Sequence, residues 1–142
     1  MQPIPYLFFN GNCHAAFTAY GQIFGSEPQI MPYAALPEDE RANMPDAPME
    51  AVMHGAVQVG AGWIYGSDDF GGNSPAMAGC NISVSLPDAA TTQRVWAALS
   101  EGGEIRMALE PAFFAPLFGT LTDRFGVRWM ILQDMPDDPA GH

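Results

Sequence analysis

The chain has 142 residues, of which 16 are acidic and 5 basic, so its formal net charge at pH 7 is −11. Apolar residues make up 48% and charged residues 15%, which is typical of a folded globular domain and excludes a disordered chain. All the basic residues are arginines, and so few cannot form the basic stripe that tracks nucleic acid or an anionic bilayer. We therefore expect no nucleic acid and no membrane surface as a main partner.

The expected location is the cytoplasm. No run of 18 apolar residues is present, and the N-terminus lacks the basic region of a signal peptide. In that compartment Cys13 and Cys80 stay as free thiols, and their spacing is not that of a zinc site.

The first half of the chain predicts a strand, a helix and three further strands. Asn12 is a good N-cap for the helix, and Gly25 follows its last apolar position. The predicted elements are a strand at 4–10, a helix from Cys13, a weak strand at 28–36, a polar excursion at 37–50, and a hairpin of strands at 51–59 and 62–67.

The second half repeats this order after a Gly-rich linker at 66–79. Asp88 is the expected N-cap of its helix. The predicted elements are a strand at 80–86, a helix at 89–101, a short strand at 104–109, and a hairpin of strands at 113–120 and 126–133.

The repeated order indicates an internal duplication. Laying the halves over one another pairs Tyr20 with Trp96, Trp63 with Trp129, and Asp68 with Asp134. We therefore predict an α+β fold in a single domain, 1–142, built from two βαβββ modules at 1–70 and 78–135. Each module would leave one sheet face concave and free for a small ligand.

Several segments resemble one known family. They are PYLFFNGNC, YGQIFG, Met53-His54-Gly55, Gly66-Ser67-Asp68, NISVS and DRFGVRWM. Together they resemble the PhnB-like branch of the vicinal oxygen chelate superfamily. This resemblance implies a glyoxalase/bleomycin-resistance-like fold with a concave mixed-sheet cleft. The branch carries a ubiquinone-pathway methyltransferase label, but the Gly-rich candidate for such a site, Gly60-Ala61-Gly62, is predicted to be a β-turn.

The resemblance also implies where a metal would bind. Glyoxalase-type members hold a divalent ion with four side chains, which an ungapped alignment places at Pro5, Ile64, Asn81 and Met130. Divalent ions of this chemistry need imidazole or carboxylate ligands, which these residues do not supply. We therefore expect no cofactor and no stoichiometric metal at this site.

The two-residue period of the strands predicts which side chains line the cleft. Arg128 would then lie at the cleft mouth, pair with an acid such as Glu110, or bind the anionic end of a ligand. The expected cleft residues are Leu7, Phe9, His54, Asn81, Ser83, Arg128 and Met130.

Other residues have two interpretations each. His54 is either a half-buried, hydrogen-bonded histidine or a general base or lone metal ligand. Cys13, in the first turn of a helix, is either inert or a nucleophile with a lowered pKa. Asp68 and Asp69 are expected in a solvated loop and the tryptophans in the core. Phe113-Phe114 either lines the cleft or belongs to the core.

Three functions follow from these observations. The first is binding of a small, partly apolar molecule without the usual metal. The second is a metal-assisted lyase, isomerase or dioxygenase that uses a displaced site around His54. The third is an interaction module without a ligand. An exposed apolar cleft would be a large patch, so we also expect a homodimer.

Overall fold

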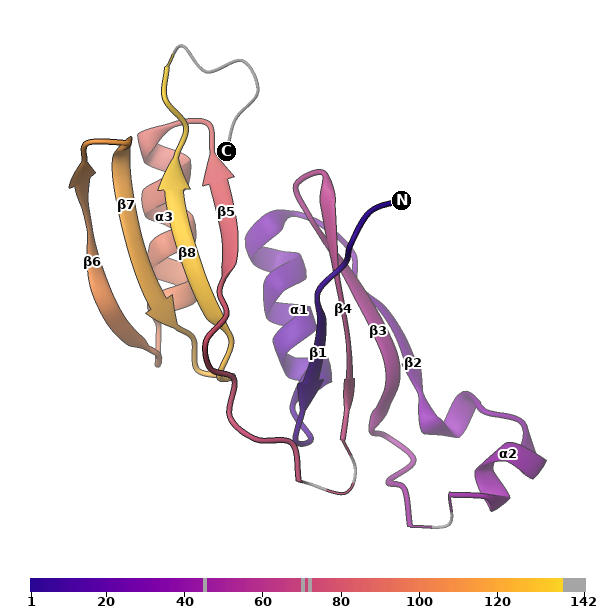
Figure 1. The fold of residues 1–142 in the computed structure, drawn as a ribbon. Helices are drawn as coiled ribbons and strands as arrows, with labels where there is room; N and C mark the ends of the chain where they lie inside the picture. The colour runs from indigo at the N-terminus through magenta and orange to yellow at the C-terminus, as the bar shows by residue number, and fades with distance from the viewer. Residues whose placement is uncertain (45, 70, 72, 137–142) are drawn as a thin grey trace. The chain divides into compact units, whose positions relative to one another are not determined.

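The computed structural model describes residues 1–44, 46–69, 71 and 73–136, and the chain divides into two compact units. Unit 1 is Met1–Pro75 and unit 2 is Ala76–His142. Figure 1 shows the elements of both. Unit 1 contains β1 (Tyr6–Phe9), α1 (Cys13–Phe24), β2 (Gln29–Pro32), the 3-10 helix η1 (Tyr33–Ala35), α2 (Glu38–Ala42), β3 (Val52–Val59) and β4 (Gly62–Asp68). Unit 2 contains β5 (Ile82–Leu86), α3 (Ala89–Ser100), β6 (Glu104–Ala112), β7 (Ala115–Thr122) and β8 (Arg128–Gln133).

The two units have the same topology, which confirms the predicted pair of βαβββ modules. The strand order is β1-β4-β3-β2 in unit 1 and β5-β8-β7-β6 in unit 2. In each sheet the first strand pairs in parallel with the last, and the other neighbours pair antiparallel. The fold class is therefore α+β with two mixed four-stranded sheets.

In unit 1, the core lies between α1 and one face of its sheet. Phe17 and Tyr20 of α1 are fully buried. Cβ atoms added at Gly55 and Gly66 would lie 3.1 Å and 2.9 Å from the Phe17 ring. These two glycines, paired across β3 and β4, let the helix approach the sheet closely.

In unit 2, the sheet packs against α3 in the same way. Trp129 and Ile131 of β8 are completely buried, and a Cβ at Gly119 of β7 would lie 2.7 Å from the Trp96 ring. The faces of the last strands show that the predicted overlay of Trp63 on Trp129 was wrong. Gly66 and Ile64 face α1, so Trp63 points to the other side of its sheet, whereas Trp129 lies on the side that faces α3.

The two helices begin with different caps. Asp88 accepts the backbone N–H of Thr91 at 2.7 Å, as predicted. Asn12 makes no side-chain cap bond, and the carboxylate of Asp68 takes that place by accepting the N–H of Cys13 at 3.0 Å. The expectation that Asp68 lies in a solvated loop was wrong: it ends β4 and is only 4% exposed.

The last hairpin also differs from the prediction. β6 extends to Ala112, so Phe113-Phe114 forms the turn between β6 and β7 and does not begin a strand. Phe113 is 98% exposed, and Phe114 is 40% exposed, so neither belongs to the core. Of the three tryptophans, Trp129 is fully buried, whereas Trp63 and Trp96 are half-buried.

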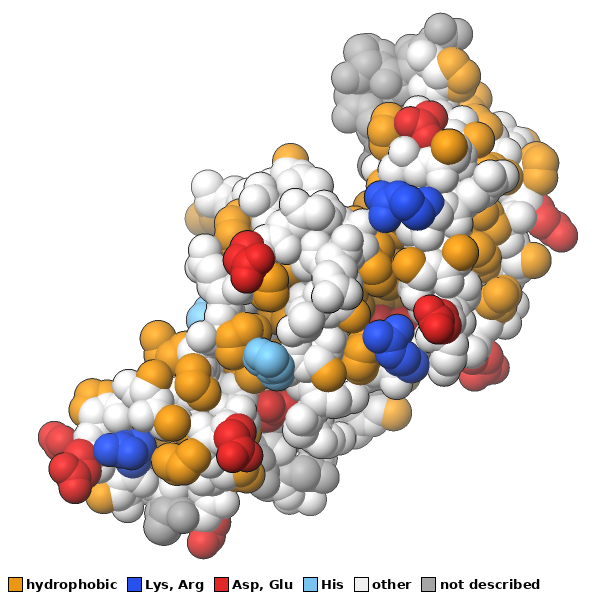
Figure 2. Space-filling model, turned by 180° about the vertical axis from the view of Figure 1, so that it is seen from behind, with side chains coloured by type: hydrophobic (Ala, Val, Ile, Leu, Met, Phe, Trp, Pro, Cys, Tyr) orange, Lys and Arg blue, Asp and Glu red, His pale blue; other side chains and the backbone are white. Residues whose placement is uncertain are grey.

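The surface agrees with the charge pattern of the sequence. Figure 2 shows red acidic and blue arginine side chains on the coloured part of that face, with no continuous blue stripe on either unit. Within the described residues, no helix has the length and apolar character needed to cross a membrane.

Candidate functional site

The face of each sheet that lies opposite its helix is the candidate binding surface, and we call it the helix-free face. In unit 1, Gly66 points to α1, and its strand partner Leu7 shares that side. Phe9 is buried at 2% exposure, edge-on to Phe17 of the helix. The prediction of Leu7 and Phe9 as cleft residues was therefore wrong, because in β1 these two side chains point to α1, and Tyr6 and Phe8 point away from it. The helix-free face of unit 1 carries Tyr6, Phe8, His54, Ala56, Tyr65 and Ser67.

His54 lies on this face among aromatic rings. Its Nδ1 atom is 3.4 Å from the Tyr6 hydroxyl, and its ring centre is 5.2 Å from that of Tyr65. The Tyr6 ring also lies 5.3 Å from that of Phe8. Tyr6 is 43% and Phe8 57% exposed, so the cluster presents apolar surface to solvent beside a phenol and an imidazole.

A cavity of about 340 Å³ adjoins the cluster at the end of β1 and β4. Tyr33 is 7% exposed there, and burial, followed by nearby Tyr6 and the carboxylates of Asp68 and Asp69, raises the pKa of its hydroxyl. Asp69 accepts hydrogen bonds from the Gly71 N–H at 3.1 Å and the Ser74 hydroxyl at 2.7 Å. The cavity volume is within the range of small-molecule pockets. Its lining residues are Phe8, Tyr33, Ser67, Asp68, Asp69 and Ser74.

The helix-free face of unit 2 is polar by comparison. Val84 pairs with Ile131, and Ile131 pairs with Gly119, which points to Trp96, so Ile82 and Val84 face α3. Their alternating neighbours lie on the other side. The helix-free face of unit 2 carries Asn81, Ser83, Ser85, Phe118, Thr120, Arg128, Met130 and Leu132.

Arg106 of β6 is a functional candidate that the sequence prediction missed. Its Nη2 atom donates to the Asn81 Oδ1 atom, to the Leu121 carbonyl at 3.0 Å and to the Trp129 carbonyl at 3.5 Å. The side chain thus crosses from the edge strand to the start of β5. The strand register shifts between Ile105 and Met107, and such an irregularity is not visible in the alternation of the sequence.

Arg128 lies at the same end of this sheet. Its Nε atom donates to the Cys80 carbonyl at 3.1 Å, just before β5. Desolvation lowers the pKa of Arg106, the positive charge of Arg128 lowers it further, and Glu104 opposes both. Two like charges therefore lie near each other on this face.

The residues at the predicted metal positions do not fit a metal. Ile64 is 2% exposed and faces α1, so its side chain does not lie on a helix-free face. Pro5 and Ile64 offer no donor atom. In the described part of the chain, no three His, Cys, Asp or Glu side chains form a cluster that could hold an ion.

Cys13 does not have the lowered pKa that a nucleophile needs. It is completely buried, and desolvation together with the charge of Asp68 raises the pKa of its thiol to about 12. Burial outweighs the helix dipole here. Cys80 is exposed, and both cysteines are free thiols.

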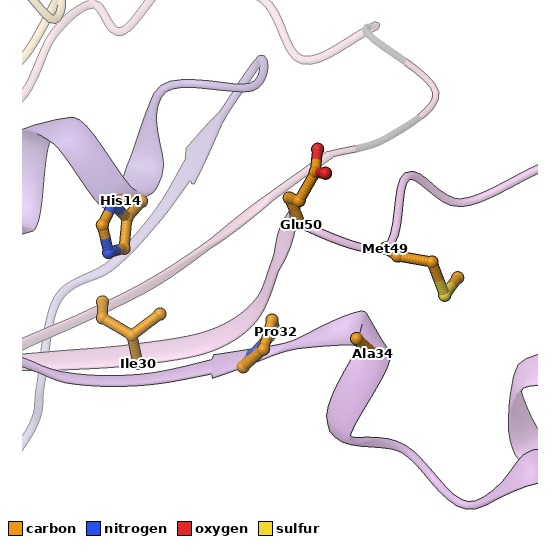
Figure 3. Close-up of a pocket in the computed structure, with 6 residues that line it drawn as sticks. All are labelled: His14, Ile30, Pro32, Ala34, Met49 and Glu50. Carbon is orange, nitrogen blue, oxygen red and sulfur yellow. The ribbon is translucent and has the colours of Figure 1, made fainter.

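A second cavity, of about 680 Å³, was not expected from the sequence (Figure 3). His14 extends from the first turn of α1 above Ile30 and Pro32 of the edge strand β2. The cavity is an open, mostly apolar groove whose lining includes one imidazole, that of His14, and one carboxylate, that of Glu50. Its lining residues are His14, Ile30, Pro32, Ala34, Met49 and Glu50.

The sequence matches one family model along almost its whole length. The model is described as 3-demethylubiquinone-9 3-methyltransferase, and it matches residues 2–132. Protein YjdN of Escherichia coli K12 is 32% identical over 136 residues, which cover 89% of this chain and 91% of YjdN.

Solved structures share the fold. Protein PA1353 of Pseudomonas aeruginosa is 36% identical with a TM-score of 0.81, over 94% of this chain and 97% of that one. The PhnB protein of Bacillus cereus is 19% identical with a TM-score of 0.74, over 94% and 99% of the two chains. A glyoxalase/bleomycin resistance protein/dioxygenase family enzyme of Burkholderia phytofirmans is 12% identical with a TM-score of 0.61, over 93% and 98%.

The glycine-rich segment Gly60-Ala61-Gly62 is the candidate for the cofactor loop that a methyltransferase would need. Gly60 has φ of 60°, and Gly60-Ala61 forms the turn of the hairpin between β3 and β4. A cofactor-binding Gly-rich loop joins a strand to a helix, with its backbone N–H groups at the helix start. The predicted β-turn is confirmed, and this segment does not have that geometry.

Proposed function

The chain belongs to the 3-demethylubiquinone-9 3-methyltransferase family, a PhnB-like group with the glyoxalase/bleomycin-resistance fold, and we propose that it binds a small, partly aromatic molecule without the usual metal. The helix-free faces are the binding surfaces. In this proposal His54, Asn81, Ser83, Arg128 and Met130 remain binding residues, while Tyr6 and Phe8 replace Leu7 and Phe9.

The observation that carries this proposal is the aromatic cluster on unit 1. Solvent-exposed aromatic side chains usually occur singly, whereas Tyr6, Phe8, His54 and Tyr65 lie together beside a cavity. Aromatic rings offer flat apolar area and, through Tyr6 and His54, hydrogen-bonding groups that fix a ligand's orientation.

The test uses a neutral aromatic probe, 2-naphthol, titrated at pH 7 and followed by NMR. We expect signals of β1 and β3 to shift, and Phe8→Ser to weaken binding about tenfold, since one aromatic contact and its buried area contribute about 1–2 kcal/mol. Phe113→Ser is the matched control, because Phe113 is an exposed phenylalanine in the β6–β7 turn. Equal affinities of the two variants, or no binding to the unaltered protein, would contradict the proposal.

A second candidate is a metal-assisted lyase, isomerase or dioxygenase that uses a displaced site around His54. The observation in its favour is the position of the His54 imidazole, on the helix-free face and 3.4 Å from the Tyr6 hydroxyl. Elemental analysis of the purified protein for Zn, Ni, Mn and Fe separates the two. The first proposal requires substoichiometric metal, and the second requires one ion per chain that His54→Ala removes.

We also propose a homodimer, because the exposed aromatic surface of unit 1 favours a covering partner. The proposed location is the cytoplasm. The chain mass is 15.3 kDa, so light scattering at micromolar concentration should give about twice that value. A mass near that of one chain would contradict the dimer.

A further inference from the structure

Two arginines, Arg106 and Arg128, lie near each other at one end of the helix-free face of unit 2, and the carboxylate of Glu104 acts on Arg106 from nearby without a hydrogen bond to it among the described residues. The recorded partners of Arg106 and Arg128 in this part of the chain are the Asn81 amide oxygen and backbone carbonyls. None of them is a carboxylate, although the chain as a whole carries a net charge of −11. Glu110, named above as one acid that could pair with Arg128, lies opposite Phe118 across β6 and β7.

Two buried polar atoms in this part of unit 2 have no hydrogen-bond partner among the described residues; one belongs to Arg106 itself and the other to Thr120, the strand partner of Met107. They are Arg106 Nε and Thr120 Oγ1, and Thr120 is only 4% exposed. Thr120 is on the helix-free face, since its neighbour Gly119 points to Trp96 on the other side. Such unsatisfied groups are rare in folded proteins because each one loses its hydrogen bonds to water on burial without gaining others.

We propose that a small molecule bound on the helix-free face of unit 2 carries an oxyanion, a carboxylate or a phosphate, and that Arg106 and Arg128 hold it at this end of the face. This inference rests on the function proposed above and specifies the ligand of this one face. An oxyanion accepts several hydrogen bonds at once and neutralises both guanidinium groups. It also supplies the acceptor that Arg106 Nε and the Thr120 hydroxyl lack.

Two methionines flank Thr120 on the neighbouring strands. Met107 and Met130 are its cross-strand partners on either side, and Met107 is 56% exposed. Methionine side chains are unbranched and change rotamer at little cost, so they can move aside for an entering group. Asn81, fixed by its bond to Arg106, keeps the guanidinium directed along the sheet.

The test compares three probes of similar size by calorimetry at pH 7: benzoate, phenyl phosphate and neutral benzyl alcohol. We expect at least one acid to bind tenfold or more tightly than the alcohol, and added salt to remove this preference. The better of the two acids identifies the oxyanion as a carboxylate or a phosphate. Equal affinities for all three probes would overturn the inference.

Variants assign the effect to the two arginines. Arg128→Gln should lower the affinity for the preferred acid tenfold without changing that for benzyl alcohol, and Arg106→Lys keeps the charge but removes the branched donor set. Arg94→Gln, on α3, is the matched control and should leave both affinities unchanged. If Arg128→Gln and Arg106→Lys both bind the acid as the unaltered protein does, the inference is wrong.

The outcomes separate this inference from the proposed function. If Phe8→Ser lowers the affinity for every probe while the arginine variants lower none, the aromatic site is supported and the oxyanion site is contradicted. If the arginine variants lower only the affinities for the acids while Phe8→Ser changes no affinity, the oxyanion site is supported and the aromatic site is contradicted.

Discussion

The two units share one topology but present different chemistry on their helix-free faces. In unit 1 this face carries Tyr6, Phe8 and Tyr65 around His54, whereas in unit 2 it carries Ser83 and Met130, with Asn81 and Arg128 at one end. Their helix-facing sides are alike, with glycines under an aromatic residue of the helix. The duplicated fold therefore depends on the helix side of each sheet, while the other side is free to differ.

The largest effect tests whether both units depend on a buried carboxylate. Asp68 accepts the N–H groups of Gly11, Cys13 and Val52, and Asp123 accepts two N–H groups of its turn and the Trp129 indole N–H. Asp68→Ala and Asp123→Ala should each lower the free energy of unfolding by about 3 kcal/mol or more, since several buried donors lose their acceptor.

Urea unfolding measures both values, with exposed Glu110→Ala as the control. If only one of the two aspartate variants has a lowered free energy of unfolding, the two carboxylates do not stabilise their units equally.

A smaller effect tests the close contact of helix and sheet. The added Cβ of Gly119→Ala would lie 2.7 Å from the Trp96 ring. The added Cβ of Gly66→Ala would lie 2.9 Å from both the Leu7 carbonyl oxygen and the Phe17 ring. Each substitution should destabilise by about 1–3 kcal/mol through overpacking. Gly62→Ala is the control, because its added Cβ would have a 3.8 Å contact, and should change stability by less than about 1 kcal/mol. Thermal unfolding of the three variants distinguishes these cases.

The smallest effect is a loss of stability at high pH, which we expect from the buried Cys13 of unit 1 and not from the exposed Cys80 of unit 2. The pKa of the Cys13 thiol is about 12 in the folded chain against an ordinary value of 9.0. The folded state therefore keeps this proton where the unfolded state loses it. Its contribution is complete below pH 9 and is lost as the pH rises toward 12, by at most about 1.4 kcal/mol per pH unit.

Urea unfolding at pH 8 and pH 10 should show this loss, and Cys13→Ala should abolish it. Cys80→Ala, at an exposed thiol, should keep it. An identical pH dependence in Cys13→Ala and the unaltered chain would show that another group is responsible.

Much of the fold could be predicted because local signals agreed with the tertiary packing. Alternation over Ile82–Leu86 gave the correct faces of β5, and the cap at Asp88 began α3 as expected. In β1 nearly every residue is apolar, so alternation carried no information, and the face was assigned to Leu7 and Phe9 instead of Tyr6 and Phe8.

The sequence by itself determined the duplicated order of strands and helices, because periodicity, caps and turn residues act over a few neighbouring positions. Only the tertiary structure decided the role of Asp68, whose three donors come from Gly11, Cys13 and Val52, and the reach of Arg106 across its sheet to Asn81. Both depend on strand register between segments far apart in the chain. Register follows from the packing of whole faces, and no short window of sequence contains it.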